Sequence, residues 1–454
     1  MTAPDSGNRS SSYLAALALG LALVGAASMV YYHLALFMPR VLEVGAARKL
    51  TGGYAFGNDF YPVWLTSREW LRARRDPYSE EITREIQQGL FGRPLDLRIP
   101  TDPLPEYRTF AYPAFTDLFF WPAAKLSFPR VRVMAVVGLA ALTLLSIVLW
   151  ARALAWRPGA HWLIVASLLT LCSYPVLEGL YADQLGLLVG FLLAASLLAL
   201  RRDRLLLAGI LMALTTIKPQ MTVLAVFYLL VWSRHDWRRR ARFVIGLLST
   251  VLLLVGTSLA VWPHWISSWV RVAIGYHRYA KPPLVSDVLA APLGPAAAGP
   301  ATFLMMAGLL AVAVALAWRN RAAVAGSMEF WLTLSLLLCL TTITLLPGQA
   351  LHDQVILLPG IFLLALLRHE LSSNWILKSL LAVGVAVLLW PWLAAFGLIG
   401  LRPLLSDRLF YSKAIFALPL RTAAVFPFVV LGLLAVAIRR APGTRATGTS
   451  SIPV

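Results

Sequence analysis

Charged side chains are scarce in this sequence of 454 residues, because Asp, Glu, Lys and Arg make up only 13% of it while 59% is hydrophobic. The mean hydropathy is +0.73. Soluble domains use about 25% charged residues, and they cannot cover repeated apolar runs of about 20 residues, each long enough to cross a membrane. This composition excludes a large soluble domain and predicts an all-α polytopic integral membrane protein.

Cysteine and the common nucleotide and metal motifs are also lacking. The two cysteines, Cys172 and Cys339, both fall inside apolar runs and give no sign of a disulfide framework or a zinc site. The sequence contains no P-loop, GxGxxG, HExxH or paired CxxC pattern. Nucleotide hydrolysis, dinucleotide redox chemistry and zinc proteolysis therefore have no support.

The sequence does contain long apolar runs. The first follows a single Arg and is longer than the apolar part of a signal peptide, so we interpret it as a retained span. Membrane spans are predicted at residues 13–37, 131–151, 160–181, 184–200, 242–262, 300–318, 329–350, 353–368, 376–400 and 414–438.

Two further segments need a separate argument. The run LLLAGILMALTTIKPQMTVLAVFYLLVW lies between two arginine-rich loops and must enter and leave on one side, so we predict two short helices meeting at Lys218. The run YPAFTDLFFWPAAKLSFP carries three prolines with Asp117 and Lys125, and we expect an interfacial or re-entrant piece on the outer side. Together these give about twelve transmembrane helices.

The net charge of +19 is concentrated in short clusters between the apolar runs, a pattern that sets membrane orientation and does not indicate nucleic-acid binding. We expect these clusters and both termini to be cytoplasmic. The segment at residues 39–109 balances its arginines with acids and is expected outside. We predict one domain over residues 1–454: a catalytic transmembrane module (13–370) with outer loops 39–130 and 262–299, C-terminal helices (371–438) and a cytoplasmic tail (439–454).

Two outer segments are rich in tryptophan and predict helices that lie in the membrane interface. They are WLTSREWLRARRDPY, in the long first outer loop, and WPHWISSWVRVAIGYHRYAKPP. Both are expected to flank a lateral entrance for lipid. The candidate contacts to an acceptor or to lipid are Tyr61, Trp64, Tyr112 and Trp265.

Polar residues near the outer face are the candidate site, because ionisable groups in a membrane are costly unless they face water or a ligand. Asp59 stands alone among aromatics in GNDFYPVW and is either a catalytic base or a solvated loop residue. Lys218, at a helix break, needs an anion, which is either a phosphate or a structural partner such as Asp183 or Glu178.

Three other groups can bind a phosphorylated sugar. Gln184 both donates and accepts, which suits sugar hydroxyls, whereas its neighbour Asp183 is either a ligand or a solvated turn residue. His352 can hydrogen-bond a phosphate or simply belong to a turn, beside Asp353. The segment GYHRYAKPP is either a phosphate clamp or a solvated loop; its candidate residues are His277, Arg278 and Lys281.

The order of these motifs over residues 54–360 resembles the GT-C superfamily of polyprenyl-phosphate-sugar-dependent glycosyltransferases. Within it, the sequence is similar to glycosyltransferase family 87, which includes mycobacterial phosphatidylinositol-mannoside α-1,2-mannosyltransferases. The resemblance is carried by GNDFYPVW, FAYPAF, YADQLGLLVGFLLAASLLAL, GILMALTTIKPQ and LHDQVILLP. It departs at Ala114, where the family has a proline, and in the turn at residues 183–186.

The resemblance implies a GT-C fold and inverting transfer of a hexose, with mannose favoured. The donor is a polyprenyl-phosphate sugar, and the acceptor is a lipid or glycan hydroxyl on the extracytoplasmic side of a bacterial plasma membrane. Asp59 takes the catalytic-base position and His352 that of the second essential polar residue, while Lys218 and Gln184 fall where the donor binds.

The alternatives are an arabinose or glucose donor, or a transporter or flippase of lipid-linked substrates. Membrane lipids are the other expected partners, and nucleic acid is not one. No cofactor is expected. Since no tight acidic cluster is visible, the reaction is predicted to be independent of metal.

Overall fold

The computed structural model describes residues 6–440 apart from 277 and 279. Over this part of the chain the secondary structure is helical, without β-strands and with a single isolated β-bridge between Pro283 and Pro347. The all-α prediction is confirmed. The predicted cytoplasmic tail lies outside the described residues from residue 441 onward.

Within the described residues, six helical segments are long and apolar enough to cross a membrane: Tyr13–Ala47, Phe128–Ala153, Trp237–Val261, Ala297–Arg319, Trp375–Leu401 and Leu418–Ile438. A bent pair, Ala160–Leu171 with Tyr174–Tyr181, brings the number to seven if it is one span. Five further helical segments are apolar but shorter, with 10–17 residues each: Gly186–Arg201, Leu205–Ile217, Val223–His235, Met328–Thr344 and Leu351–Leu366. The chain is thus a polytopic membrane protein, and the total of about twelve helices stays a prediction.

The first span combines α1 (Ser6–Tyr31), a π-helical turn (Tyr32–Phe37) and α2 (Met38–Ala47). The helices of the body are α6 (Phe128–Ala153), α7 (Ala160–Leu171), α8 (Tyr174–Tyr181), α9 (Gly186–Arg201), α10 (Leu205–Leu214), α11 (Val223–His235), α12 (Trp237–Val261), α14 (Leu284–Arg319), α15 (Met328–Thr344), α16 (Leu358–Leu366), α17 (Trp375–Leu401) and α21 (Phe426–Arg440). Short helices join them at α18 (Asp407–Phe410), α19 (Lys413–Phe416) and α20 (Leu418–Ala423). The loops that are predicted to lie outside, called the outer loops from here on, form α3 (Tyr61–Ala73), α4 (Glu80–Phe91), α5 (Phe115–Phe120) and α13 (Trp265–Tyr276).

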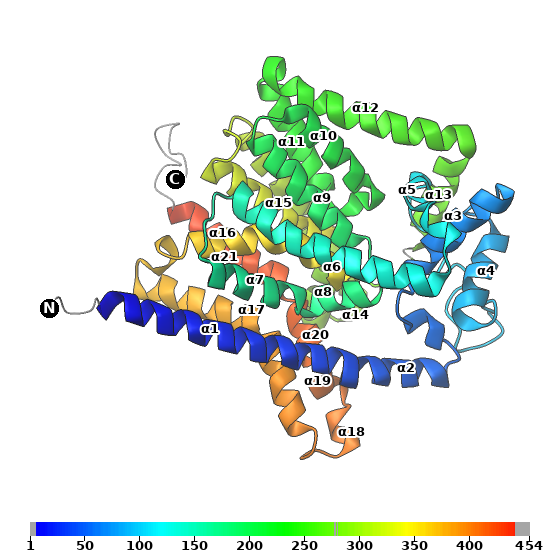
Figure 1. Ribbon diagram of the computed structural model, residues 1–454, viewed down its shortest axis with the longest axis horizontal. Helices are drawn as coiled ribbons and strands as arrows, with labels where there is room; N and C mark the ends of the chain where they lie inside the picture. Colours follow the sequence, from blue (N-terminus) through cyan, green and yellow to red (C-terminus); the bar gives the residue numbers. More distant parts are fainter. Residues whose placement is uncertain (1–5, 277, 279, 441–454) are drawn as a thin grey trace.

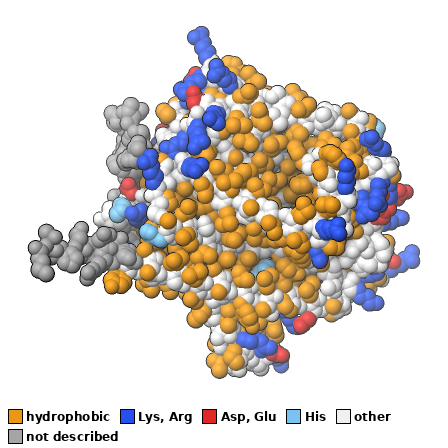
Figure 2. All heavy atoms as spheres, in the orientation of Figure 1, with side chains coloured by type: hydrophobic (Ala, Val, Ile, Leu, Met, Phe, Trp, Pro, Cys, Tyr) orange, Lys and Arg blue, Asp and Glu red, His pale blue; other side chains and the backbone are white. Residues whose placement is uncertain are grey.

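The long axis of the molecule separates the chain ends from the loop helices. Figure 1 shows the start of α1 and the end of α21 at one end, and α3, α4, α5 and α13 at the other. Figure 2 shows hydrophobic side chains over the middle of the visible face, with Lys and Arg gathered toward its margins. This arrangement places the loops at residues 48–127 and 262–283 on the end opposite the described chain ends.

The predicted helix break at Lys218 is confirmed, and the segment after residue 110 lacks a long helix, as expected; the placement of both segments relative to the membrane stays a prediction. Helices α10 and α11 are separated by 3-10 turns at Thr215–Ile217 and Pro219–Met221, and Lys218 between them is non-helical (φ −129, ψ 76). Between residues 110 and 127 the chain forms α5, a helix of 6 residues, and a 3-10 turn at Ala123–Lys125. At a rise of about 1.5 Å per residue, such a helix is far too short to cross a membrane.

The outer loops have a hydrophobic core of their own, and this corrects the prediction that Trp64 and Trp265 contact lipid, whereas the lateral entrance stays a prediction. Trp64 and Trp265 are only 5% and 4% exposed, and Trp265 packs edge-on against Phe115. Helix α3 packs on α5 and on the turn Ala123–Lys125, so its apolar face is covered by protein. Trp64 and Trp265 therefore hold the outer loops together and do not contact lipid.

Candidate active site

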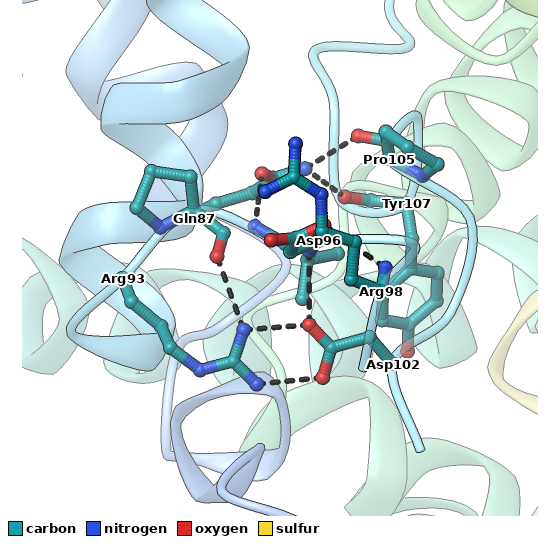
Figure 3. A network of polar contacts seen from close by, with 9 residues as sticks. Gln87, Arg93, Asp96, Arg98, Asp102, Pro105 and Tyr107 are labelled. Atoms are coloured by element: carbon teal, nitrogen blue, oxygen red, sulfur yellow. Dashed lines mark hydrogen bonds and ion pairs between the residues drawn. The ribbon is translucent and has the colours of Figure 1, made fainter. Parts of the chain in front are cut away.

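A polar network fixes the outer loop that leads to the site (Figure 3). Arg93 forms a double ion pair with Asp102, at 2.6 Å for each N···O distance. The side-chain amide of Gln87 on α4 donates to the backbone oxygens of Pro105 and Tyr107, at 2.6 and 3.0 Å. These contacts hold the segment up to residue 107, so the next residue, Arg108, is delivered in a defined position.

Asp59 is fixed by its own backbone. Gly57 adopts a positive φ of 76°, and its N–H donates to the Tyr181 oxygen at 2.8 Å. The Asp59 N–H donates to the Ala182 oxygen at 3.2 Å. The loop that follows the first span is thereby held on the turn between α8 and α9.

A continuous chain of polar contacts starts at the Asp59 carboxylate. Arg108 forms an ion pair with one carboxylate oxygen, and the side-chain amide of Gln184 donates to the other. The Gln184 oxygen accepts from Lys218 Nζ at 3.0 Å, and Lys218 Nζ lies 2.7 Å from Asp353 Oδ1. The Lys218 and Asp353 side chains are 10% and 1% exposed. Asp183 and Glu178 were the predicted partners of Lys218 under the structural alternative, and the structure supplies Asp353 instead.

Three local features bring these side chains together: the start of α9, the helix break at Lys218, and the 3-10 turn Leu351–Leu357 that carries His352 and Asp353. His352 Nε2 lies 3.6 Å from Asp353 Oδ1. Gly186 is essential to this approach, because a Cβ there would lie 2.1 Å from Asp353 Oδ1 and 3.5 Å from Lys218 Nζ.

Replacing Gly186 with Ala is expected to push Asp353 away from Lys218, lowering both turnover and thermal stability. Overpacking of this kind costs about 1–3 kcal/mol. The matched control is Gly138→Ala in α6, where an added Cβ meets nothing within 4 Å and where Ala is the better helix former. Equal melting temperatures and activities of the two variants would contradict the tight approach at Gly186.

The polar chain lines a cavity of about 850 Å³. One part of its lining is apolar and comes from the first span and from α20 with the residue after it: Phe37, Met38, Val41, Leu420 and Ala424. The rest of the lining combines polar and aromatic side chains with apolar ones such as Ile217 and Leu351. A cavity of this size with a few convergent polar groups is typical of a small-molecule site.

Electrostatics keep Asp59 ionised. Burial by itself raises the pKa of this carboxyl, but the Arg108 guanidinium, His352 and the Gln184 hydrogen bond together hold the pKa below its usual value. Arg108 is always charged at neutral pH. Asp59 is therefore a carboxylate with a fixed orientation at the cavity wall.

Seven residues predicted from the sequence line this cavity: Asp59, Tyr112, Gln184, Lys218, Lys281, His352 and Asp353. Two other predicted site residues, Arg278 and Tyr61, do not line the cavity. Arg278 is exposed and pairs with Glu106 at 3.6 Å, and Tyr61 packs edge-on against Phe128. His277 lies outside the described residues.

Asp183 was predicted to bind the donor, but in the structure it does not line the cavity. Its backbone is left-handed (φ 55), which turns the side chain back toward Gly57; a Cβ on Gly57 would lie 2.9 Å from Asp183 Oδ2. The side chain is fully buried, and burial, opposed by Arg132, raises the pKa of Asp183 to about 7. The Asp183 side chain therefore lies against the loop that carries Asp59 and not on the wall of the cavity.

Several cavity residues were missed by sequence analysis, among them Arg108, His33, Tyr174 and Arg421. Arg108 is 49 residues from its partner Asp59, and no local pattern connects the two. His33 and Tyr174 lie within apolar runs and there look like core residues. Glu178 was not among the predicted site residues, although it was considered as a partner for Lys218, and it also lines the cavity.

No group of three or more His, Cys, Asp or Glu side chains is placed to hold a metal ion in the described part of the chain. The oxygen-rich ligand sets that Mg²⁺ and Ca²⁺ prefer are thus not formed by these residues. Independence of metal stays a prediction.

The fold and the cavity define a polytopic membrane protein with a cavity that is lined by both acidic and basic side chains and lies next to its outer loops. The model of glycosyltransferase family 87 matches residues 110–347, which is more than half of the 454 residues. The chain belongs to glycosyltransferase family 87 and is a glycosyltransferase. Comparisons with curated proteins and with solved structures give no match. The matched range contains Gln184 and Lys218 but neither Asp59 nor His352, so any role of these last two depends on the geometry.

Proposed function

We propose that this chain is an inverting glycosyltransferase that transfers a hexose, with mannose favoured, from a polyprenyl-phosphate carrier to an acceptor hydroxyl. The acceptor is a lipid or a glycan, and the reaction takes place on the extracytoplasmic side. The observation that carries the proposal is the polar chain from Arg108 through Asp59, Gln184 and Lys218 to Asp353 along one cavity. The apolar part of the same cavity suits the carrier lipid.

The proposed reaction is a single displacement. The acceptor oxygen forms a bond to the anomeric carbon, the bond from that carbon to the phosphate oxygen breaks, and the acceptor proton passes to the Asp59 carboxylate. A phosphate leaves as an anion, so no second carboxylic acid is required. Lys218 and His352 stabilise the departing phosphate, with Lys281 as a further cation of the cavity.

The extracytoplasmic location is supported by charge. Arginine clusters such as that at residues 234–242 follow the positive-inside rule for a cytoplasmic location, whereas the loops around the cavity mix acids with bases. A reaction outside the cytoplasm has no access to nucleotide sugars, which favours a lipid-linked donor. The membrane would be the bacterial plasma membrane, with both termini cytoplasmic.

The proposal is tested with purified protein in liposomes, supplied with synthetic polyprenyl-phosphate mannose, glucose or arabinofuranose and with extracted membrane lipids as acceptors. We expect sugar transfer from the mannose donor with release of an equal amount of polyprenyl phosphate, and no loss of activity in EDTA. Transfer from glucose or arabinofuranose alone would change the sugar. Movement of intact donor across the bilayer without cleavage would replace the proposal by a transporter.

A further inference from the structure

A second polar cluster lines the same cavity, on the wall formed by the first span and α8. It consists of His33 in the π-helical turn, and of Tyr174 and Glu178 on α8. Tyr174 and Glu178 are four residues apart and so lie on one side of their helix. The rings of His33 and Tyr174 meet edge to face, with centroids 5.6 Å apart.

Four polar atoms of this cluster are buried and unpaired in the described part of the chain. Both ring nitrogens of His33, the Tyr174 hydroxyl and Glu178 Oε2 make no hydrogen bond within the described part of the chain. His33 and Tyr174 are each only 1% exposed. Buried polar groups are nearly always hydrogen-bonded, and one left unsatisfied costs about 1–3 kcal/mol. Such groups gathered on one cavity wall indicate a missing ligand.

The neighbouring Tyr32 shows that a buried polar group in this region can find a hydrogen-bond partner. Its hydroxyl is also fully buried, yet it donates to the Phe416 oxygen at 2.7 Å, and Tyr32 does not line the cavity. The π-helical turn begins at Tyr32 and carries His33 on the wall of the cavity. Such turns are rare and are frequent at functional sites.

The cluster is joined to the reaction centre through α8. Gly179 lies against the 3-10 turn of His352, because a Cβ on Gly179 would lie 3.1 Å from His352 Cβ. Glu178 also lines the same cavity as Asp59, Asp353 and Lys281. A ligand at the cluster would therefore also reach the proposed reacting groups.

The chemistry of the three side chains selects the ligand. A neutral imidazole offers one donor and one acceptor, a phenol offers both, and a carboxyl group accepts in either protonation state. Neighbouring hydroxyl groups can satisfy all three at once. A phosphate suits them less, because none of the three is a lysine or an arginine, whereas Lys218 and Lys281 stand elsewhere on the lining of the cavity.

We propose that His33, Tyr174 and Glu178 form a subsite for the hydroxyl groups of a neutral sugar or polyol, separate from the cations that hold the phosphate. This inference rests on the proposed function and adds which groups are recognised on the second wall of the cavity. The hydroxyls belong either to the donor sugar or to a sugar-bearing acceptor. Kinetics with the two substrates varied separately distinguish these sources.

The test compares Tyr174→Phe and Glu178→Gln with the control Tyr32→Phe. Loss of one hydrogen bond to the substrate is expected to raise a KM about 3- to 10-fold with little change in kcat. A higher KM for the donor assigns the subsite to the transferred sugar, and a higher KM for the acceptor assigns it to the acceptor. Unchanged KM values for both substrates in an active enzyme would overturn the inference.

Thermal stability separates a binding role from a structural one. Tyr174→Phe removes a hydroxyl without a partner in the described chain and is expected to leave the melting temperature unchanged or higher. Tyr32→Phe removes a satisfied hydroxyl and should lower the melting temperature without affecting either KM. A loss of stability in Tyr174→Phe equal to that in Tyr32→Phe would show that the hydroxyl serves the fold.

A binding measurement keeps this inference apart from the proposed reaction. Methyl α-mannoside, methyl α-glucoside and myo-inositol are added separately at high millimolar concentration to the wild type and to the Tyr174→Phe/Glu178→Gln double variant. At least one is expected to raise the melting temperature of the wild type alone, even if no donor is turned over. Equal shifts in both proteins, or no shift with any of the three, would overturn the subsite.

Discussion

Replacing Asp59 with Asn is expected to lower sugar transfer by about 10²- to 10⁴-fold, the usual contribution of a positioned general base. The variant keeps the size of the side chain but cannot accept the proton of the acceptor hydroxyl. Because Arg108 and Gln184 still surround the position, binding of the donor should change much less than turnover. The measurement is the initial rate of transfer over a range of donor concentrations, which separates kcat from KM.

The pH profile gives the Asp59 assignment a sharper test. In the wild type the pKa of Asp59 lies below its usual value, so the carboxylate is ionised from pH 5 to pH 8 and imposes no acidic loss of activity there. In Arg108→Met, burial is opposed by fewer charges and the pKa rises. Activity of that variant should therefore fall as the pH is lowered and recover as it is raised. Profiles of the same shape in the wild type and in Arg108→Met would contradict a role for Asp59 as base.

Asp117→Asn is the matched control for Asp59→Asn. Asp117 is also a buried carboxyl of the outer loops, but it does not line the cavity; Thr66 and Ser67 donate to its Oδ1 at 2.9 and 3.3 Å. Burial raises its pKa well above the usual value, so an uncharged amide is a close substitute for the neutral acid. Turnover should be unchanged. An equal loss in both variants would mean that the outer loops, and not the base, had been damaged.

The parts of the fold that depend on local sequence were predictable. Apolar length predicted the long spans, and the combination of an ammonium group and a proline predicted the break at Lys218, which the structure confirms. Helix α3 was predicted less well. An amphipathic pattern is the same whether the apolar face contacts lipid or protein, and only the packing on α5 shows that Trp64 lies in a protein core.

The candidate site could be predicted from polar side chains that lie next to apolar runs, because placing such groups in a membrane costs free energy. Asp59, Gln184, Lys218 and Asp353 stand out because each is polar beside apolar runs, and the structure places all four along one cavity. Arg108 could not be found in this way, since it is one arginine among many in a polar loop. Its position depends on contacts such as that between Arg93 and Asp102.

Backbone conformation explains the remaining difference. Asp183 and Gln184 are adjacent, and polarity alone gave both the same role. The left-handed conformation at Asp183 directs its side chain behind the cavity wall, whereas Gln184 faces Asp59. A sequence of residue types does not report such a turn, because neither residue is a glycine that would mark it.

The second large expected effect is a loss of stability when the ion pair between Lys218 and Asp353 is broken. Its N···O distance is 2.7 Å and both side chains are buried, so removing either charge leaves the other uncompensated. Each single variant, Lys218→Met and Asp353→Leu, is expected to lose about 3–5 kcal/mol of stability. The double variant should recover most of this loss, since replacing a whole buried pair by apolar groups is often neutral.

Activity should follow a different pattern from stability across the same three variants, because the phosphate needs the ammonium group of Lys218 whether or not Asp353 is present. We expect the double variant to fold as well as the wild type, judged by melting temperature in detergent, and to remain inactive. Recovery of transfer together with stability would show that Lys218 serves only as a structural partner of Asp353. A double variant no more stable than the single variants would contradict the ion pair itself, and the role of Lys218 in holding the cavity together would have to come from Gln184.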